Sequence, residues 1–416
     1  MDYAAAETYL LDLELFGMRF GLDRMRKLST VLGMPQRRFA SVHVVGTNGK
    51  SSTARMLAAI FARHGLRAGS YTSPHVRSFR ERVEVGGVAL GESDFTEAVS
   101  RAAHATALVD RTLPDDDRVT QFEVLTAAAF HTLARARVDV AVIEAGLGGR
   151  HDATNVIPSK VQVLTGVGLE HTRWLGPTVG HIAEEKVAVV PDHGCLVTPA
   201  LDAEAEAVAA RVTRAHGARR VRLAEGAERA VPMLPHAPGR YQRRNFALAR
   251  AAAEAFLERP LDAEAVRSAA AEVAVPGRLE CVAERPLVLH DGAHNPAAAE
   301  ALAESLPDVV GARPLVGVIA VLDDKDASGV LRPLLPLLSA AVLTRGGGER
   351  YLPPATLASL AGQLVPGLET ETVRDPREGV ARARELAGPK GVVLVTGSLH
   401  LLGDLVRAPG ARASSL

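Results

Sequence analysis

The segment Val42–Thr53, with the sequence VHVVGTNGKSST, constrains this chain more than any other part of it. A run rich in β-branched residues leads into a turn bracketed by Gly46 and Gly49, and Lys50 opens a helical pattern. Such a strand, glycine loop and helix N-terminus bind phosphate, because backbone N–H groups face the anion and glycines allow it to approach closely. A turn with a solvated lysine is the alternative interpretation. The strand-to-helix context favours ATP binding, although Val44 stands where the standard P-loop has its first glycine.

Composition narrows the class of protein. With 416 residues the chain exceeds one ordinary core, which predicts two domains. Lys and Arg number 48, as do Asp and Glu, so no net charge indicates a nucleic-acid or anionic-membrane partner. Only Cys195 and Cys281 occur, which argues against a disulfide framework or a cysteine zinc site. The N-terminus does not have the plan of a signal peptide and no uncharged apolar stretch is long enough to span a bilayer, so we expect a cytoplasmic protein.

The order of the predicted elements indicates an α/β protein. Helical patterns over 4–13, 22–32 and 123–136 accompany buried-strand runs at 68–72, 138–144, 161–165 and 194–197. Strands separated by helices predict a doubly wound, mostly parallel sheet of P-loop type in a first domain, residues 1–283. Further strand runs at 287–290, 315–319, 341–344 and 392–396, each followed by helix-compatible sequence, predict a smaller Rossmann-like domain, residues 284–416.

Three polar residues follow predicted strand ends in the first domain. Glu144 ends an apolar strand and enters a turn with three glycines, while Ser73 and His171 lie just past two other strands. Ligands of doubly wound folds bind beyond the carboxyl ends of the strands, and the Mg²⁺ that accompanies ATP takes oxygen ligands. Taken one by one, these residues are also consistent with a turn serine, a solvated glutamate and a surface histidine. Together they suggest a place for the metal.

Two other positions are ambiguous from the residues alone. Lys186 follows Glu184 and Glu185, and an exposed charge cluster is the favoured interpretation. Asp291 and His294 lie in a glycine-containing turn between a strand and a helix, which suits contacts to a ribose or phosphate. A simple turn with a proline at the helix start is the competing interpretation.

Motifs along nearly the whole chain make a family resemblance specific. The chain resembles the folylpolyglutamate synthase/dihydrofolate synthase family of the Mur-ligase superfamily. The motifs that carry the resemblance, in the family's order, include GTNGK at 46–50, YTSPH at 71–75, FEVLT at 122–126, EAGLGGR at 144–150 with DATN at 152–155, HT at 171–172 with WLG at 174–176, PGRLE at 276–280, DGAHNP at 291–296 and TGS at 396–398.

The resemblance implies roles for individual residues. Catalytic roles fall to Lys50, to His171 and to Lys186, the last as an N-carboxylysine that supports a second Mg²⁺. Ser73, Glu144 and His171 would hold magnesium. The residues implied to bind ATP are Gly46, Thr47, Asn48, Gly49, Lys50, Ser51, Ser52, Asn245, Arg278, Asp291 and His294. Those implied to lie near the pterin are Phe16, Gly17, Phe122 and Glu123.

The reaction implied by the resemblance is ATP-dependent amide formation by a monomer. A carboxylate of dihydropteroate or folate attacks the γ-phosphorus, and the amine of L-glutamate then displaces phosphate from the acyl phosphate. The chain departs from the family's usual residues at Ser51, His151, Arg173 and His290. The surroundings of His151 and Lys186 motivate one alternative, a Mur-type amide ligase for a non-folate carboxylate. A non-catalytic ATP-binding regulator is a further hypothesis.

Overall fold

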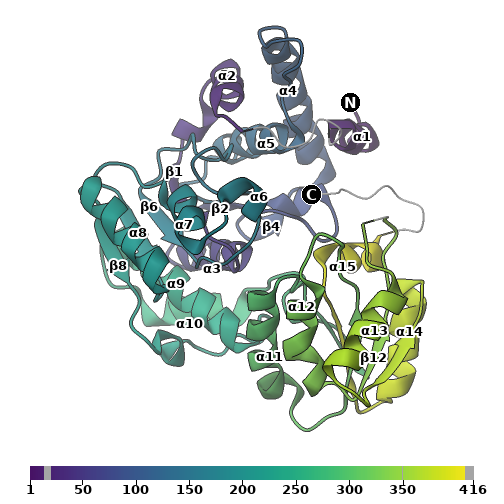
Figure 1. Cartoon of the computed structure of the whole chain (residues 1–416). Helices are drawn as coiled ribbons and strands as arrows, with labels where there is room; N and C mark the ends of the chain where they lie inside the picture. The colour runs from purple at the N-terminus through teal and green to yellow at the C-terminus, as the bar shows by residue number, and fades with distance from the viewer. Residues whose placement is uncertain (14–19, 349, 408–416) are drawn as a thin grey trace. The chain divides into compact units, whose positions relative to one another are not determined.

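The computed structural model describes residues 1–13, 20–348 and 350–407 (Figure 1). Contacts within the chain divide it into two compact units. The first comprises Met1–Met233 and Arg244–Val273, and the second comprises Leu234–Arg243 and the residues from Ala274 onward. One division point therefore falls inside helix α9 (Arg240–Leu257). The predicted domain boundary between 283 and 284 stays a prediction. Within the described ranges, no helix is both long and apolar enough to span a membrane.

The first unit is built on a mostly parallel sheet, as predicted. Among its described residues, eight strands lie in the order β4-β3-β2-β5-β1-β6-β7-β8. The six strands from β2 to β8 in this order pair in parallel, and β3 and β4 are antiparallel additions at one edge. The strands are β1 (Ala40–Val45), β2 (Ala68–Tyr71), β3 (Val83–Val85), β4 (Val88–Ala89), β5 (Val140–Glu144), β6 (Val161–Leu164), β7 (Cys195–Thr198) and β8 (Arg219–Arg222).

Helices cover both faces of this sheet. On one face, α4 and α5 pack over β2 and β5, and α7 and α8 pack beside them over β6 and β7. On the other face, α3 packs on β2 and β5, and α10 packs on α3. The helices of this unit, apart from α9, are α1 (Tyr3–Leu13), α2 (Asp23–Val31), α3 (Lys50–Arg63), α4 (Glu92–Asp110), α5 (Gln121–Arg135), α6 (Thr172–Leu175), α7 (Val179–Val187), α8 (Ala203–Ala215) and α10 (Ala263–Glu272).

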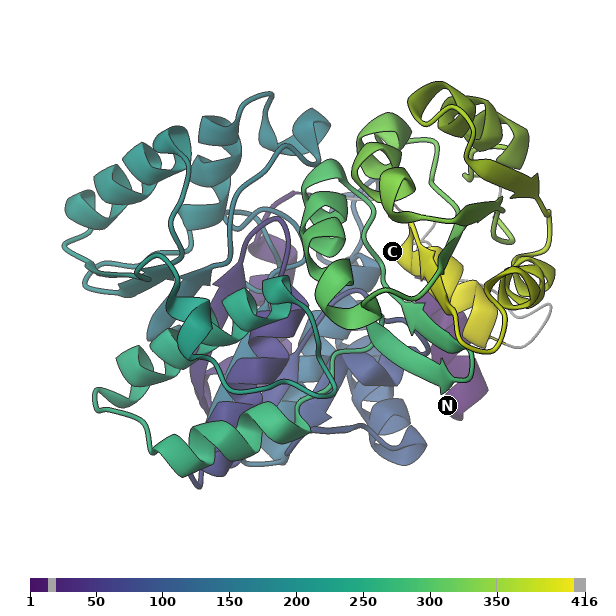
Figure 2. The same cartoon turned by 90° about the horizontal axis from the view of Figure 1, so that it is seen from below.

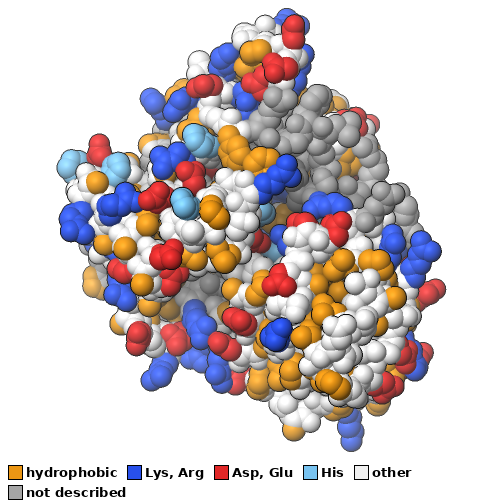
Figure 3. All heavy atoms as spheres, viewed as in Figure 1, with side chains coloured by type: hydrophobic (Ala, Val, Ile, Leu, Met, Phe, Trp, Pro, Cys, Tyr) orange, Lys and Arg blue, Asp and Glu red, His pale blue; other side chains and the backbone are white. Residues whose placement is uncertain are grey.

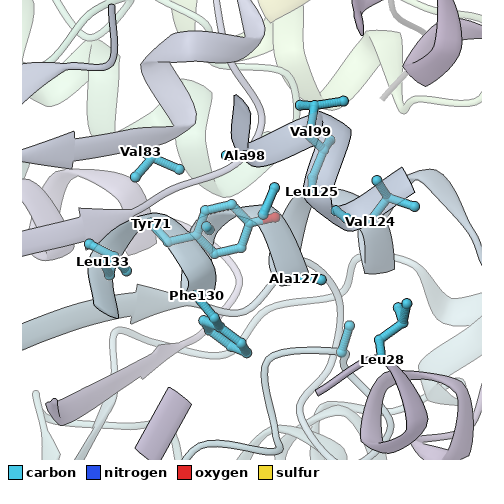
Figure 4. Close-up of a cluster of buried hydrophobic side chains, with 14 of the residues drawn as sticks. Leu28, Tyr71, Val83, Ala98, Val99, Val124, Leu125, Ala127, Phe130 and Leu133 are labelled. Atoms are coloured by element: carbon cyan, nitrogen blue, oxygen red, sulfur yellow. The ribbon is translucent and has the colours of Figure 1, made fainter. Parts of the chain in front are cut away.

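A large apolar cluster fixes the first of these layers. Figure 4 shows Tyr71 of β2 beside Phe130 and Leu133 of α5, with Leu28 of α2 nearby. These side chains are fully buried. Burying a large apolar side chain stabilises a fold by roughly 1.5–3 kcal/mol, so the cluster holds the end of β2 firmly. The loop at Ser73 starts from that end.

The second unit has its own sheet. Figure 2 shows this unit in green to yellow. Among the described residues it has six strands in the order β13-β12-β11-β14-β10-β9, parallel except for β9. This agrees with the predicted Rossmann-like arrangement. The elements are β9 (Glu280–Glu284), β10 (Leu287–His290), α11 (Pro296–Val310), β11 (Leu315–Ile319), α12 (Ala327–Leu334), β12 (Ala340–Leu343), α13 (Pro354–Leu364), β13 (Glu369–Thr372), α14 (Pro376–Ala387), β14 (Val392–Thr396) and α15 (Leu399–Val406).

The sequence did not predict the β3–β4 hairpin. Its two turn residues, Gly86 and Gly87, both have positive φ angles, of 63° and 79°. This pair is the backbone requirement of a tight two-residue hairpin turn. The strands on either side are only three and two residues long, too short for an alternating pattern to stand out.

Candidate active site

The glycine loop predicted to bind phosphate joins β1 to α3. Gly46 has a φ of 150° and Gly49 a φ of 83°. A Cβ added to Gly46 would come within 1.9 Å of Thr165 Oγ1, and one added to Gly49 would lie 2.5 Å from Asn245 Oδ1. Both positions therefore need glycine for conformation and for space. Thr165 also donates a 2.6 Å hydrogen bond to the Asn48 carbonyl, so β6 helps to shape the loop.

Two lysines converge on one carbonyl of this loop. Lys50 Nζ donates to the carbonyls of Gly46 and Thr47, each at 3.1 Å. Lys186 Nζ, at the end of α7, donates to the same Gly46 carbonyl at 2.8 Å. Two lysine side chains at one loop favour the binding of an anion there.

Lys186 is not part of an exposed charge cluster. Its exposed fraction is 4%, so the interpretation favoured from the residues alone is wrong. Burial, reinforced by the nearby charge of Lys50, lowers the pKa of Lys186 to about 7. Glu170 and Asp152 oppose this shift by their negative charges. A substantial fraction of the side chain is therefore a neutral amine near pH 7.

The carboxylate of Glu144 lies next to the loop. Glu144 ends β5 with an exposed fraction of 1%. It accepts a 3.0 Å hydrogen bond from Ser51 Oγ and another of 3.0 Å from the Ser73 backbone N–H. Ser51 Oγ also lies 3.4 Å from the Ser73 carbonyl oxygen. The structure thus places the backbone of Ser73 next to the carboxylate of Glu144, and it adds the hydroxyl of Ser51.

His171, the third predicted ligand, stands at the start of α6 with a φ of 53°, and its side chain is exposed. Across the described part of the chain, no three His, Cys, Asp or Glu side chains gather as a metal-binding group. A magnesium site here would therefore rely on the serine oxygens and water as well as on Glu144. Such a mixed set of oxygen ligands suits Mg²⁺, which keeps several waters.

The residues predicted to lie near the pterin differ in their positions and contacts in the structure. Phe16 and Gly17 lie outside the described residues. Phe122 is half-buried, and its ring touches Gly146, where an added Cβ would come within 2.6 Å of it. Glu123 is buried: both of its carboxylate oxygens bind Arg24 Nε at 3.0 Å, and it completes the capping box of α5 with Thr120. Glu123 therefore holds α5 in place, and its contact with a pterin stays a prediction.

The nucleotide-binding residues predicted from the DGAHNP motif lie in the second unit. The carboxylate of Asp291 accepts hydrogen bonds from Tyr241 Oη at 2.6 Å, Leu279 N at 2.9 Å and Ala293 N at 2.9 Å. Burial raises the pKa of Asp291, an effect opposed by the charge of Arg278. His294 Nδ1 lies 2.8 Å from the Gly292 carbonyl. Asp291 thus organises this turn, which also presents His294.

The sequence did not predict the roles of two residues that shape these loops. Tyr241 reaches Asp291 across 50 residues, and no local pattern gives such a pairing. Asp152 is buried and accepts from Leu147 N at 2.8 Å and Thr154 N at 3.0 Å, which fixes the turn after Glu144. The DATN motif contains Asp152, but its sequence does not reveal this bracing role.

Comparisons with known proteins agree with this geometry. A family model described as the Mur ligase, glutamate ligase domain, matches residues 277–399. The chain is 36% identical over 402 residues to the dihydrofolate synthase/folylpolyglutamate synthase of Mycobacterium tuberculosis, covering 88% of this chain and 82% of that protein. It is 31% identical over 431 residues to the Bacillus subtilis protein of the same name, with 97% and 98% covered.

Solved structures resemble the chain over the same span. The Mycobacterium tuberculosis folylpolyglutamate synthase complexed with ADP and AMPPCP superposes with a TM-score of 0.87 at 33% identity, covering 97% of this chain and 98% of that one. Escherichia coli FolC in complex with DHPP and ADP gives a TM-score of 0.83 at 27% identity, with the same shares covered. The similarity therefore extends over both units.

Proposed function

Because the chain belongs to the folylpolyglutamate synthase/dihydrofolate synthase family, we propose that it is an ATP-dependent ligase that joins L-glutamate to dihydropteroate, to the γ-carboxylate of a reduced folate, or to both. The acceptor carboxylate attacks the γ-phosphorus of ATP and forms an acyl phosphate, with ADP leaving. The amine of glutamate then attacks the acyl carbon, and phosphate leaves as the amide forms. ATP and glutamate are cytoplasmic metabolites, so we place the enzyme in the cytoplasm. We also propose that it acts as a monomer.

The observation that carries the proposal is the buried carboxylate of Glu144, bonded to Ser51 and to the Ser73 backbone at the phosphate-binding loop. A buried carboxylate bonded to a serine hydroxyl fits Mg²⁺, which takes oxygen ligands. Ser73, Glu144 and His171 would hold the ion, with Ser51 as a neighbouring oxygen. When bound, the ion neutralises charge on the transferring phosphoryl group.

The loop and its lysines would bind the triphosphate. Residues 46–52 and the N-terminus of α3 would surround the phosphates, although the Thr47 N–H is bonded to the Gly166 carbonyl, and Lys50 would exchange its two loop carbonyls for phosphate oxygens. Asn245, packed against Gly49, is a proposed nucleotide contact in the first unit. Arg278, Asp291 and His294 are proposed contacts from the second unit.

Lys186 has the protonation state that carbamylation needs. Its neutral amine attacks the carbon of CO₂ and releases a proton to solvent, which turns the uncharged amine into a carbamate with one negative charge. With a pKa of about 7, the reactive neutral form is available without a strongly basic solution. The carbamate would bring a negative charge to the Gly46 carbonyl side of the loop and support a second Mg²⁺.

Phosphate release from Mg-ATP and glutamate tests the proposal, with dihydropteroate, tetrahydrofolate or no acceptor added. Release stimulated by either pterin supports it, and the pattern of stimulation tells which acceptor is used. Lys50→Met should abolish the stimulated release, whereas Lys390→Met, at an exposed turn, should not. Equal release with and without each pterin would refute the proposed acceptors.

A further inference from the structure

Residues 165–168, which follow β6, are hydrogen-bonded to the phosphate-binding loop, and we call this segment the clasp. The Gly166 carbonyl accepts from the Thr47 N–H at 2.9 Å. The Gly168 N–H donates to Thr47 Oγ1 at 3.0 Å, and Thr47 Oγ1 donates to the Gly168 carbonyl at 3.3 Å. Gly166 has a φ of 148°, a conformation that favours glycine at this point. The clasp therefore fixes both the backbone and the side chain of Thr47.

Every polar group of Thr47 has a partner inside the first unit. Its N–H and its hydroxyl are bonded to the clasp, and its carbonyl accepts from Lys50 Nζ at 3.1 Å. The exposed fraction of Thr47 is 8%. The family resemblance implies that Thr47 binds ATP, whereas these contacts occupy the groups with which it could do so. The geometry therefore favours a different role for this residue.

Thr165, the first residue of the clasp, sets the direction of the next peptide in the loop. Its hydroxyl donates to the Asn48 carbonyl at 2.6 Å. The peptide between Asn48 and Gly49 is trans, so this carbonyl and the Gly49 N–H point in opposite directions. The Gly49 N–H therefore points away from Thr165, at the N-terminus of α3. The first N–H groups of a helix have no acceptor within the helix and suit an anion.

The clasp leads directly to His171, a predicted metal ligand. Only Leu169 and Glu170 lie between Gly168 and His171. The φ of 53° at His171 is unfavourable for a residue other than glycine and persists where the surrounding structure holds it. His171 is exposed at the start of α6, and in the region of α6 hydrophobic and basic side chains meet at the surface (Figure 3). So short a connection links the position of His171 to that of the clasp.

We propose that Thr47 and Thr165 are positioning residues: they fix the direction of the loop peptides and join the loop to the segment that carries His171. This inference rests on the proposed function and gives Thr47 a different role in it, since the residue acts through the clasp and not on the nucleotide. Phosphate bound in the loop immobilises the loop, and the clasp transmits this order to residues 165–171. The nucleotide therefore orders the His171 segment before any metal ion joins the two.

Amide hydrogen exchange of the full chain tests this coupling. ADP is added with EDTA, so that no metal ion bridges the nucleotide and His171. In the wild type, ADP should slow exchange in residues 46–52 and also, by at least about threefold, in residues 165–171. In Thr47→Val, saturating ADP should still slow exchange in 46–52 but leave 165–171 unchanged, whereas Thr47→Ser keeps the hydroxyl and should behave like the wild type. Equal slowing of 165–171 in Thr47→Val and wild type, or none in the ADP-bound wild type, would overturn the inference.

Steady-state kinetics distinguish positioning from direct contact. Thr47→Val and Thr165→Val should each raise the KM for ATP about tenfold, and the double variant should also raise it about tenfold, because either change releases the same loop. Thr213→Val is the control, since its hydroxyl is bonded only to carbonyls of its own helix, α8, and its KM should equal that of the wild type.

An effect of about hundredfold in the double variant would overturn the inference, because Thr47 would then act on the nucleotide independently of the clasp. A wild type that no pterin stimulates would refute the proposed function instead. Hydrogen exchange with ADP needs no acceptor, so it would still decide whether the clasp couples the loop to the His171 segment.

Discussion

The burial of Lys186 leads to a quantitative prediction about stability. Replacing it with methionine keeps a long apolar stem in the same place and removes the ammonium. Lys186 is 4% exposed, so methionine should pack without a large void. The variant loses the 2.8 Å hydrogen bond to the Gly46 carbonyl, worth about 1 kcal/mol, while Lys50 still binds that oxygen.

The sign and size of the effect follow from protonation. Burial, with the charge of Lys50, lowers the pKa of Lys186 from 10.5 to about 7 in the folded chain. Below pH 7 both folded and unfolded chains carry the proton, and the full cost of the buried ammonium opposes folding. Between pH 7 and 10.5 only the unfolded chain carries it, so wild-type stability rises by about 1.4 kcal/mol per pH unit. Lys186→Met should therefore be more stable by roughly 3 kcal/mol at pH 7, and this advantage should fall by about 2.5 kcal/mol by pH 9.

Urea unfolding at pH 7, 8 and 9 measures this difference. Trp174, the chain's one tryptophan, lies in the same unit as Lys186, so its fluorescence reports the relevant transition. Buffers free of CO₂ keep the lysine unmodified. Lys160→Met, at a side chain that is 51% exposed, is the control and should differ from wild type by the same amount at every pH. A Lys186→Met advantage that stays constant from pH 7 to 9 would refute the reasoning.

Four further predictions follow from other residues. Gly49→Ala should weaken ATP binding and lower the melting temperature more than Gly65→Ala. Both glycines have φ near 80°, but only at Gly49 would the added Cβ lie 2.5 Å from a side-chain oxygen. Calorimetry and nucleotide titration compare the two variants. Glu144→Gln should lower pterin-stimulated phosphate release at least about 100-fold and raise the Mg²⁺ concentration needed, as a magnesium titration will show. Tyr241→Phe should cost about 2 kcal/mol of stability in thermal unfolding by removing a 2.6 Å hydrogen bond to a carboxylate. Burial lowers the pKa of His43 to about 3. The stability that the neutral His43 side chain contributes is therefore present above pH 6.5 and is lost as the pH falls toward 3. The urea midpoint of His43→Gln should fall less steeply between about pH 6.5 and 5 than that of the wild type.

The sequence predicted the buried parallel strands well because their signal is local. The apolar run ending at Glu144 and the run at 392–396 became central strands, β5 and β14, each covered on both faces. A strand buried on both faces is a continuous β-branched run, which the chain itself displays. Edge elements are different: β8 (Arg219–Arg222) and β13 (Glu369–Thr372) are polar, and only their neighbours in the sheet make them strands.

The candidate site was predictable where it follows strand ends and unpredictable where it depends on burial. Glu144 and Ser73 could be placed together because parallel strands end at the same edge of the sheet. The burial of Lys186 could not be read from its neighbours, Glu184 and Glu185, which are charged. Its burial comes from segments distant in sequence: the turn at Gly149 packs on the end of α7, and the Lys186 Nζ reaches the Gly46 carbonyl.

Lys186 is a residue that folding alone would not select. An apolar side chain of similar length would fill the same space without the cost of a buried ammonium facing Lys50. Both lysines donate to the Gly46 carbonyl, and when Lys186 is protonated this single oxygen does not offset both charges. An anion at the loop, whether a phosphate or the carboxylate of a carbamylated lysine, would relieve this repulsion. Binding of phosphate at the loop would therefore stabilise this pair of lysines, which folding alone does not favour.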